Sequence, residues 1–189
     1  RLAGPNTRRI DLRGKSVVPG FIDDHAHFQE EGAYWTEELR LDGVESRKQA
    51  LEMIRARAQQ KGPNQWVYTL GGWSPDQFSD DSRPFTREEL DKIAPNNPVF
   101  LQFTRAYYYL NSKAIEMTGM DKMTDAAIQR VNGRPTGLVD GDAVGGRLRN
   151  AAGFLKAIPK EIFEASSMKM LRDFSEAGLT ASGGGCQYA

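Results

Sequence analysis

Residues 17–27 read Val17-Val18-Pro19-Gly20-Phe21-Ile22-Asp23-Asp24-His25-Ala26-His27 and contain both histidines of the chain. The apolar run before the histidines is typical of a buried parallel strand, so we expect extended backbone from Val17 to His27. Side chains two apart in a strand leave the same face, which directs both imidazoles into one space. Neutral imidazole is the commonest metal ligand in proteins, and both rings can reach one ion at about 2.0–2.1 Å. We therefore interpret His25 and His27 as half of a metal site, with two hydrogen-bonded histidines that hold no metal as the alternative.

The longer pattern around the histidines resembles the first barrel strand of the amidohydrolase superfamily, which carries Pro-Gly-x-Ile-Asp-x-His-x-His. Further segments narrow the resemblance to amidohydrolase family 3, the YtcJ-like metal-dependent hydrolases. These segments are Arg9 to Lys15, Gly71-Gly72-Trp73, Pro84 to Asp91, Asn97-Pro98-Val99, Asn111 to Ala114, Gly133 to Leu138 and Ala177 to Thr180. They run in family order, so the resemblance covers nearly all of the chain.

The resemblance implies an α/β fold built as part of a (β/α)8 TIM barrel. Such a barrel takes roughly 250 residues, whereas this chain has 189 and begins with Arg1 rather than Met. We therefore expect an N-terminal fragment of a longer protein. Residues 1–16 would be a remnant of a small β-sandwich domain. Residues 17–189 would form the first part of the barrel, with a long α+β insertion after strand 1 at about residues 45–165.

Local signals predict the elements in more detail. Ser46, the Thr86 and Glu89 capping box, and Asn111 each mark the start of a helix. Asn132-Gly133 suits a two-residue hairpin turn, and Pro159 suits a first helical turn. Together with the hydrophobic pattern, these signals predict strands at Arg8–Leu12, Trp66–Leu70, Pro98–Phe103, Ile128–Val131, Thr136–Val139 and Leu179–Ser182. They predict helices from Ser46 to Gln60, from Thr86 to before Pro95, from Asn111 to Gly119, from Ala143 to Phe154 and from Pro159 to Gly178.

Three further site residues follow from position. Asp23 is expected to orient one of the histidine ligands. Trp73 follows a strand where barrel loops build sites, so it is a candidate substrate contact, with a packed core indole as the more favoured alternative. Cys186 reads as a small buried hydrophobe, or as a ligand if the barrel brings it to the histidines. The resemblance places the remaining ligands and the general acid/base aspartate beyond residue 189, so no catalytic residue is expected within the chain.

The function implied by the resemblance is hydrolysis of carbon–nitrogen bonds in small amide-like substrates by metal-activated water, with zinc as the expected divalent ion. Many relatives have a histidine where this chain has Thr104-Arg105-Ala106-Tyr107. That difference gives some support to the alternative, a non-catalytic binding or regulatory relative of the amidohydrolases, whereas the intact pair of His25 and His27 argues against it.

The amino-acid composition limits the classes of partner that we expect. The 25 basic and 25 acidic residues form no long run of one sign, so we expect no nucleic-acid partner. No stretch reaches the roughly 18 apolar residues of a membrane span. An oligomer is compatible with the sequence, and the single cysteine indicates no compartment.

Overall fold

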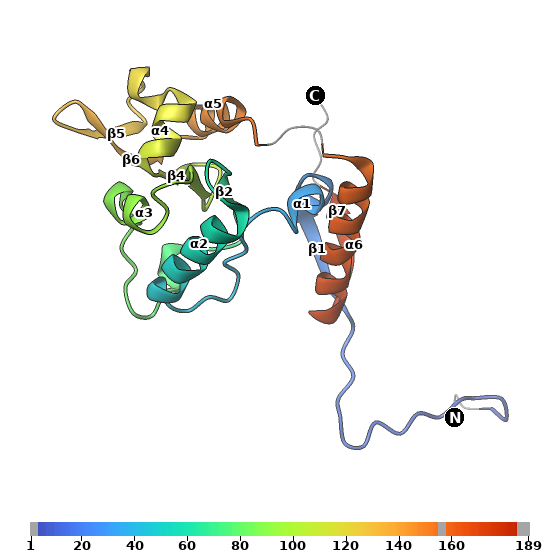
Figure 1. Ribbon diagram of the computed structural model, residues 1–189. Coiled ribbons are helices and arrows are strands. Elements are labelled where there is room, and N and C mark those ends of the chain that lie inside the picture. The colour runs from blue at the N-terminus through green and yellow to red at the C-terminus, as the bar shows by residue number, and fades with distance from the viewer. Residues whose placement is uncertain (1–3, 155–157, 185–189) are drawn as a thin grey trace.

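The computed structural model describes residues 4–154 and 158–184, and its elements form a mixed α/β fold with two separate sheets (Figure 1). The smaller sheet has two strands and the larger has five. The chain enters the smaller sheet, crosses to the larger, and returns to the smaller sheet near its end. The α/β class predicted from the sequence is confirmed.

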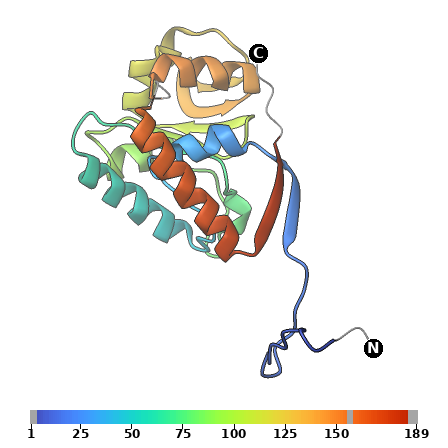
Figure 2. The same ribbon diagram turned by 90° about the vertical axis from the view of Figure 1, so that its right-hand side faces the viewer.

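The two-stranded sheet pairs β1 (Phe21–Ala26) with β7 (Leu179–Gly184) in parallel. Two helices accompany it, α1 (Phe28–Tyr34) and α6 (Lys160–Glu176), which pack against each other. Figure 2 shows β1 and β7 side by side, with α6 running up from the lower end of β7. Gly20 permits this pairing, because a Cβ at that position would lie 2.2 Å from the Thr180 Cγ2 atom. The Pro-Gly step before β1 therefore has a packing role.

The five-stranded sheet has the order β2-β3-β4-β6-β5. The β2 and β3 strands are parallel, and the other neighbours are antiparallel. The bounds are β2 Val67–Leu70, β3 Val99–Gln102, β4 Tyr107–Leu110, β5 Ile128–Val131 and β6 Arg134–Asp140. Asn132 and Gly133, between β5 and β6, have φ angles of 51° and 77°. Positive φ at both positions is what a primed hairpin turn requires, so the predicted hairpin is confirmed.

Helices cover the five-stranded sheet and begin where the caps predict. The Ser46 Oγ accepts the Gln49 amide, the Thr86 and Glu89 side chains complete a capping box, and the Asn111 Oδ1 accepts the Ala114 amide. The elements are α2 Arg47–Lys61, η1 Pro75–Gln77, α3 Arg87–Ile93, α4 Ser112–Thr118, η2 Met120–Lys122 and α5 Asp142–Ala152. Side chains that alternate along each strand fill a core on both faces of this sheet. Val99 and Leu101 lie in one core cluster and Phe100 in the other.

Three expectations differ from the structure. Residues 8–12 form no strand, because no described segment offers them a hydrogen-bonding partner. The β1 strand was predicted to be buried, yet Phe21 and Ile22 are 66% and 73% exposed. Among the described residues, β7 is the only strand paired with β1, so nothing closes its other edge. Finally, the extended backbone expected as far as His27 ends with β1 at Ala26, because His27 caps α1, a helix that no local signal predicted. The division of the chain at residue 16 stays a prediction.

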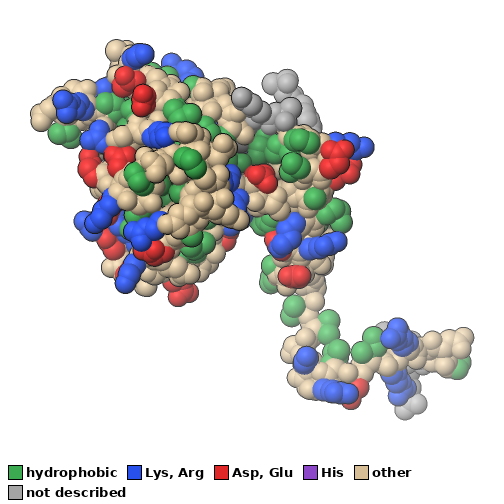
Figure 3. All heavy atoms as spheres, in the orientation of Figure 1, with side chains coloured by type: hydrophobic (Ala, Val, Ile, Leu, Met, Phe, Trp, Pro, Cys, Tyr) green, Lys and Arg blue, Asp and Glu red, His purple; other side chains and the backbone are tan. Residues whose placement is uncertain are grey.

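Hydrophobic side chains at the surface gather on the two-stranded half. Figure 3 shows them in green over this half and along the N-terminal segment. Those on the segment and β1 are Ile10, Leu12, Val17, Val18, Phe21 and Ile22, and those on α6 are Ile162, Phe163, Met168 and Leu171. In the described parts of the chain, we find no helix with the length and apolar character needed to cross a bilayer.

Candidate metal site and its neighbouring cavity

His25 and His27 lie at the carboxyl end of β1, where the strand passes into α1. Their ring centroids are 5.5 Å apart, with 73° between the ring planes. His25 is exposed and His27 is half-buried, so solvent can reach the pair. The His27 carbonyl accepts the Glu31 amide at 3.0 Å, which fixes the His27 backbone as the first turn of α1. The two rings therefore lie close together, although His27 follows the last residue of β1 and is not part of the strand.

Asp23 acts on the backbone beside the first histidine. Its Oδ1 accepts the His25 amide at 3.0 Å. This contact holds the local turn of the strand at His25. That Asp23 also orients an imidazole ring stays a prediction.

The histidine pair is incomplete as a metal centre. Within residues 4–154 and 158–184, no group of three or more histidine, cysteine, aspartate or glutamate side chains could hold an ion. Cys186, a conditional ligand in the sequence analysis, lies outside the described residues. This part of the chain therefore supplies two candidate protein ligands.

A cavity of about 290 Å3 adjoins His27. One side comes from the two-stranded half, with His27 and Glu31, and the other side comes from the five-stranded half. The residues from the five-stranded half are Leu70, Gln102, Thr104, Arg105 and Arg149. Leu70 and Gln102 end the parallel strands β2 and β3, Thr104 and Arg105 lie in the turn to β4, and Arg149 comes from α5. The candidate site is thus shared between the two sheets.

Trp73 lies in the core of the five-stranded half. Its side chain is 5% exposed and packs against four other aromatic rings. The indole N–H donates to the Thr69 hydroxyl and to the Gln102 carbonyl, both at 3.0 Å. These contacts are those of the packed indole favoured in the sequence analysis. A direct contact between Trp73 and a substrate stays a prediction.

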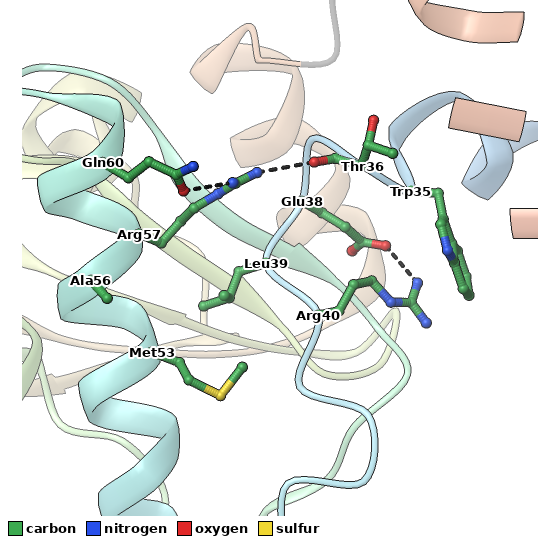
Figure 4. Close-up of a pocket in the computed structure, with 9 residues that line it drawn as sticks. All are labelled: Trp35, Thr36, Glu38, Leu39, Arg40, Met53, Ala56, Arg57 and Gln60. Carbon is green, nitrogen blue, oxygen red and sulfur yellow. Dashed lines mark hydrogen bonds and ion pairs between the residues drawn. The ribbon is translucent and has the colours of Figure 1, made fainter. Parts of the chain in front are cut away.

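A second cavity, of about 550 Å3, lies between α2 and residues 35–46, the connector that joins the two halves. Figure 4 shows Glu38 and Arg40 of the connector paired on one side, with Met53, Ala56, Arg57 and Gln60 of α2 on the other. The Glu38 carboxylate also accepts the Leu70 amide at 2.7 Å, so the connector is tied to the end of β2. Burial raises the pKa of Glu38 to about 7, although Arg40 and the Leu70 amide favour its charged form.

The connector is also tied to α6. The Trp35 indole N–H donates to Asp173 at 2.8 Å, and the Ser166 hydroxyl accepts the Thr36 amide at 3.2 Å. The Arg40 guanidinium stacks on the Trp35 ring, 3.4 Å from its centroid. These contacts hold the two halves, and so the two walls of the smaller cavity, in a defined relation.

Sequence reasoning did not identify the residues that face His27 across the cavity. Arg105 stands in the segment noted for its missing histidine, at the carboxyl end of a predicted strand, and this position was the available signal. Arg149 carried no signal, because its approach to His27 depends on how α5 packs on the sheet.

The chain matches the amidohydrolase family over residues 8–189 and belongs to that family. It is 30% identical over 146 residues to putative amidohydrolase YtcJ of Bacillus subtilis, covering 74% of this chain and 27% of that protein. It is 32% identical over 142 residues to the N-substituted formamide deformylase of Arthrobacter pascens, covering 71% of this chain and 26% of that protein. These matches confirm the resemblance to amidohydrolase family 3. The chain spans about a quarter of the length of these relatives.

A solved structure supports the fold. It is an uncharacterized metal-dependent hydrolase from Pyrococcus horikoshii OT3, with a TM-score of 0.52 and 20% sequence identity. The match covers 87% of this chain and 30% of that one. At this level of identity the likeness concerns the arrangement of the elements.

Proposed function

We propose that this chain forms part of a metal-dependent hydrolase that acts on carbon–nitrogen bonds of small amide-like substrates. Membership of the amidohydrolase family and the likeness to a metal-dependent hydrolase support the class of enzyme. The observation that carries the proposal for this chain is the convergence of His25 and His27 at the end of β1. These two residues would be ligands of one divalent ion, zinc in the first instance.

The distance between the two rings fits a shared ion. A ring nitrogen about 2.0–2.1 Å from zinc puts the ion about 3.2 Å from the ring centroid, so two rings at a tetrahedral angle have centroids about 5.2 Å apart. The observed separation is 5.5 Å. Imidazole nitrogens are also a donor set that zinc accepts.

The barrel assignment is part of the same proposal. Parallel strands joined through a crossover helix are the repeating unit of a (β/α)8 barrel, and α6 precedes β7 in that way. We assign β1 and β7 to neighbouring barrel strands and the five-stranded half to an insertion between them. Barrel enzymes carry their sites at the carboxyl ends of the strands, which is where the histidines lie.

The chemistry follows from the ion and the cavity. A bound divalent ion lowers the pKa of its water toward about 7 and polarises a carbonyl oxygen. His25 and His27 would bind as neutral imidazoles, Asp23 would hold the His25 backbone in place, and the adjoining cavity would receive the substrate. Catalytic zinc sites hold three protein ligands. The 189-residue chain alone should therefore bind the ion weakly and hydrolyse nothing.

Zinc titration followed by NMR of the imidazole resonances tests the proposal. The signals of His25 and His27 should shift together with one apparent affinity, and His27→Gln should abolish the response of His25. Asp121→Asn, an exposed carboxylate on the other half, is the matched control and should change nothing.

The proposal fails if the two rings respond independently, or if calorimetry shows that the double variant His25→Gln/His27→Gln, which has no histidine left, binds zinc as tightly as the wild-type chain. Independent responses would favour the non-catalytic binding relative. Amide hydrolysis by this chain alone would contradict the need for further ligands.

A further inference from the structure

Arg149 is a cation with unused hydrogen-bonding capacity in the cavity beside His27. Its Nη1 donates to the Gln102 Oε1 over a long 3.4 Å, and its Nε is buried without a hydrogen-bond partner. No carboxylate of the described residues forms an ion pair with it. A guanidinium offers five N–H donors, so most of those on the half-buried Arg149 have no partner among the described residues.

Other arginines of the same half differ. Arg47 donates to both oxygens of Glu89 and to two backbone carbonyls, and Arg40 pairs with Glu38 and Asp42. Arg147, which precedes Arg149 by two residues on α5, pairs with Asp125. Arg57 also has a buried Nε without a partner, but its Nη atoms donate to Gln60 and to the Thr36 and Glu37 carbonyls. Arg149 differs in having one long hydrogen bond and no ion pair among the described residues. A desolvated donor without a partner is costly unless a ligand satisfies it.

The fold holds Arg149 in this position through a tight helix–sheet contact. A Cβ at Gly145 would lie 1.9 Å from the Tyr108 ring, so glycine is what lets α5 press directly on β4. Arg149 lies one helical turn further along the same face. Its partner Gln102 is oriented in turn, because the Gln102 Nε2 donates to the Leu70 carbonyl at 3.1 Å. The Gln102 Oε1 is thereby directed toward Arg149.

The charges of the cavity are divided between its walls. Among the described residues that line the cavity, the five-stranded half contributes the cations Arg105 and Arg149, and the two-stranded half contributes His27 and Glu31. Glu31 and Arg105 both have interaction partners of their own. An anionic group entering the cavity is therefore drawn to the wall that carries Arg149, away from Glu31.

We propose that Arg149 binds a carboxylate of the substrate and that Gln102 holds the Arg149 guanidinium in position. This inference rests on the proposed function and specifies its substrate class, which is an N-acyl amino acid or a similar amide with a free carboxylate. Arg149 would donate hydrogen bonds to that carboxylate, and the amide carbonyl of the same substrate would face His27. A cavity of about 290 Å3 suits a molecule of this size.

A binding comparison between N-benzoylglycine and its uncharged primary amide tests the inference. The two ligands have the same shape and differ in the carboxylate. Calorimetry on the metal-free chain should show the carboxylate bound about tenfold to a hundredfold more tightly, because ion-assisted hydrogen bonds to arginine are strong. Arg149→Gln should remove that preference, and Arg149→Lys should restore part of it.

Arg147→Gln is the matched control, since it removes an exposed arginine two positions away on the same helix. It should leave the preference unchanged, and the NMR spectrum of each variant establishes that it is folded. Equal affinity of the wild-type chain for the two ligands would overturn the inference, as would an equal loss in Arg147→Gln. Acetate binding as tightly as N-benzoylglycine would overturn the amide part, leaving a site for simple carboxylates.

The outcomes separate this inference from the proposed function, because the carboxylate contact needs no metal. If zinc fails to shift the histidine signals while Arg149 still selects the carboxylate, the hydrolase proposal falls and the anion site stands. If zinc binds the histidines and Arg149→Gln changes nothing, the hydrolase proposal stands and the substrate class falls.

Discussion

The two halves of this molecule bury their strands to opposite extents. In the five-stranded half, Val99, Phe100 and Leu101 of β3 are all fully buried. In the two-stranded half, the equally apolar Phe21 and Ile22 of β1 are mostly exposed. The difference lies in the neighbours, since β3 has strands on both edges and cores on both faces, whereas β1 pairs with β7 alone among the described residues. An apolar run thus indicates a strand, and its neighbours decide the burial.

The comparison also concerns the candidate site. The candidate metal ligands lie on the half with little core, and the cations that share a cavity with His27 lie on the half that holds both core clusters. The geometry of the cavity therefore depends on the connector and on the packing of α1 against α6, as well as on the strands themselves.

The sharpest test of the comparison is a pair of matched truncations. Leu101→Ala, in fully buried β3, should cost about 2–5 kcal/mol in the free energy of unfolding, because it leaves a cavity in a closed core. Ile22→Ala, in β1 at 73% exposure, should cost less than about 1 kcal/mol. Urea unfolding followed by tryptophan fluorescence measures both. A similar cost for the two substitutions would break the contrast between the halves.

A smaller effect is expected at Asn111, whose side chain joins α4 to the strands. It accepts the amides of Val99 and Ala114 and donates to the carbonyls of Asn97 and Ala94. Asn111→Ala should lower the free energy of unfolding by about 2–3 kcal/mol, since it removes a helix cap and leaves buried backbone groups unpaired. Asn150→Ala, at an exposed position on α5, should stay within about 0.5 kcal/mol. The idea would be refuted by equal melting temperatures of the two variants.

The smallest effect concerns Glu38, at the junction of the halves. Its pKa is about 7 in the folded chain, against an ordinary value of 4.5. The folded chain therefore holds a proton that the unfolded chain releases between these pH values. The stability from this proton is fully present below about pH 4.5 and is lost as the pH rises through about 7.

Glu38→Gln should remove that pH dependence, although it keeps one of the two acceptor oxygens that now serve Arg40 and the Leu70 amide. The wild-type free energy of unfolding should fall relative to the variant between pH 5 and 8, by up to about 1–3 kcal/mol. Urea titrations at several pH values measure the difference, with Glu45→Gln, an exposed glutamate, as control. Parallel pH curves for wild type and Glu38→Gln would show that burial does not govern this carboxylate.

Local chemistry made much of the fold predictable. Ser46, Thr86 and Asn111 cap their helices, and Asn132-Gly133 turns its hairpin, because each signal acts within a few residues. The short helix α1 has no such signal and depends on packing against α6, which lies far along the chain. The exposure of β1 was not predicted, because it too depends on which distant segments pair with the strand.

The candidate site also contains residues that the sequence predicted and residues that it did not. The sequence predicted that His25 and His27 lie close together, but strand periodicity is not the full reason, because β1 ends at Ala26 and His27 precedes α1. That Arg149 shares a cavity with His27 depends on Gly145 contacting Tyr108 and on the connector that joins the halves. No local pattern in the sequence predicts such long-range contacts.

The pairing of β1 with β7 joins residues as far as 159 positions apart, as in the contact of Thr180 with Phe21. Closing a loop of that length costs about 4–5 kcal/mol of chain entropy. The five-stranded half lies within the loop and depends on shorter separations, so its early folding would draw the ends together before β7 arrives. The histidine-bearing strand would then be docked late, and its apolar side chains would stay open to aggregation until that step.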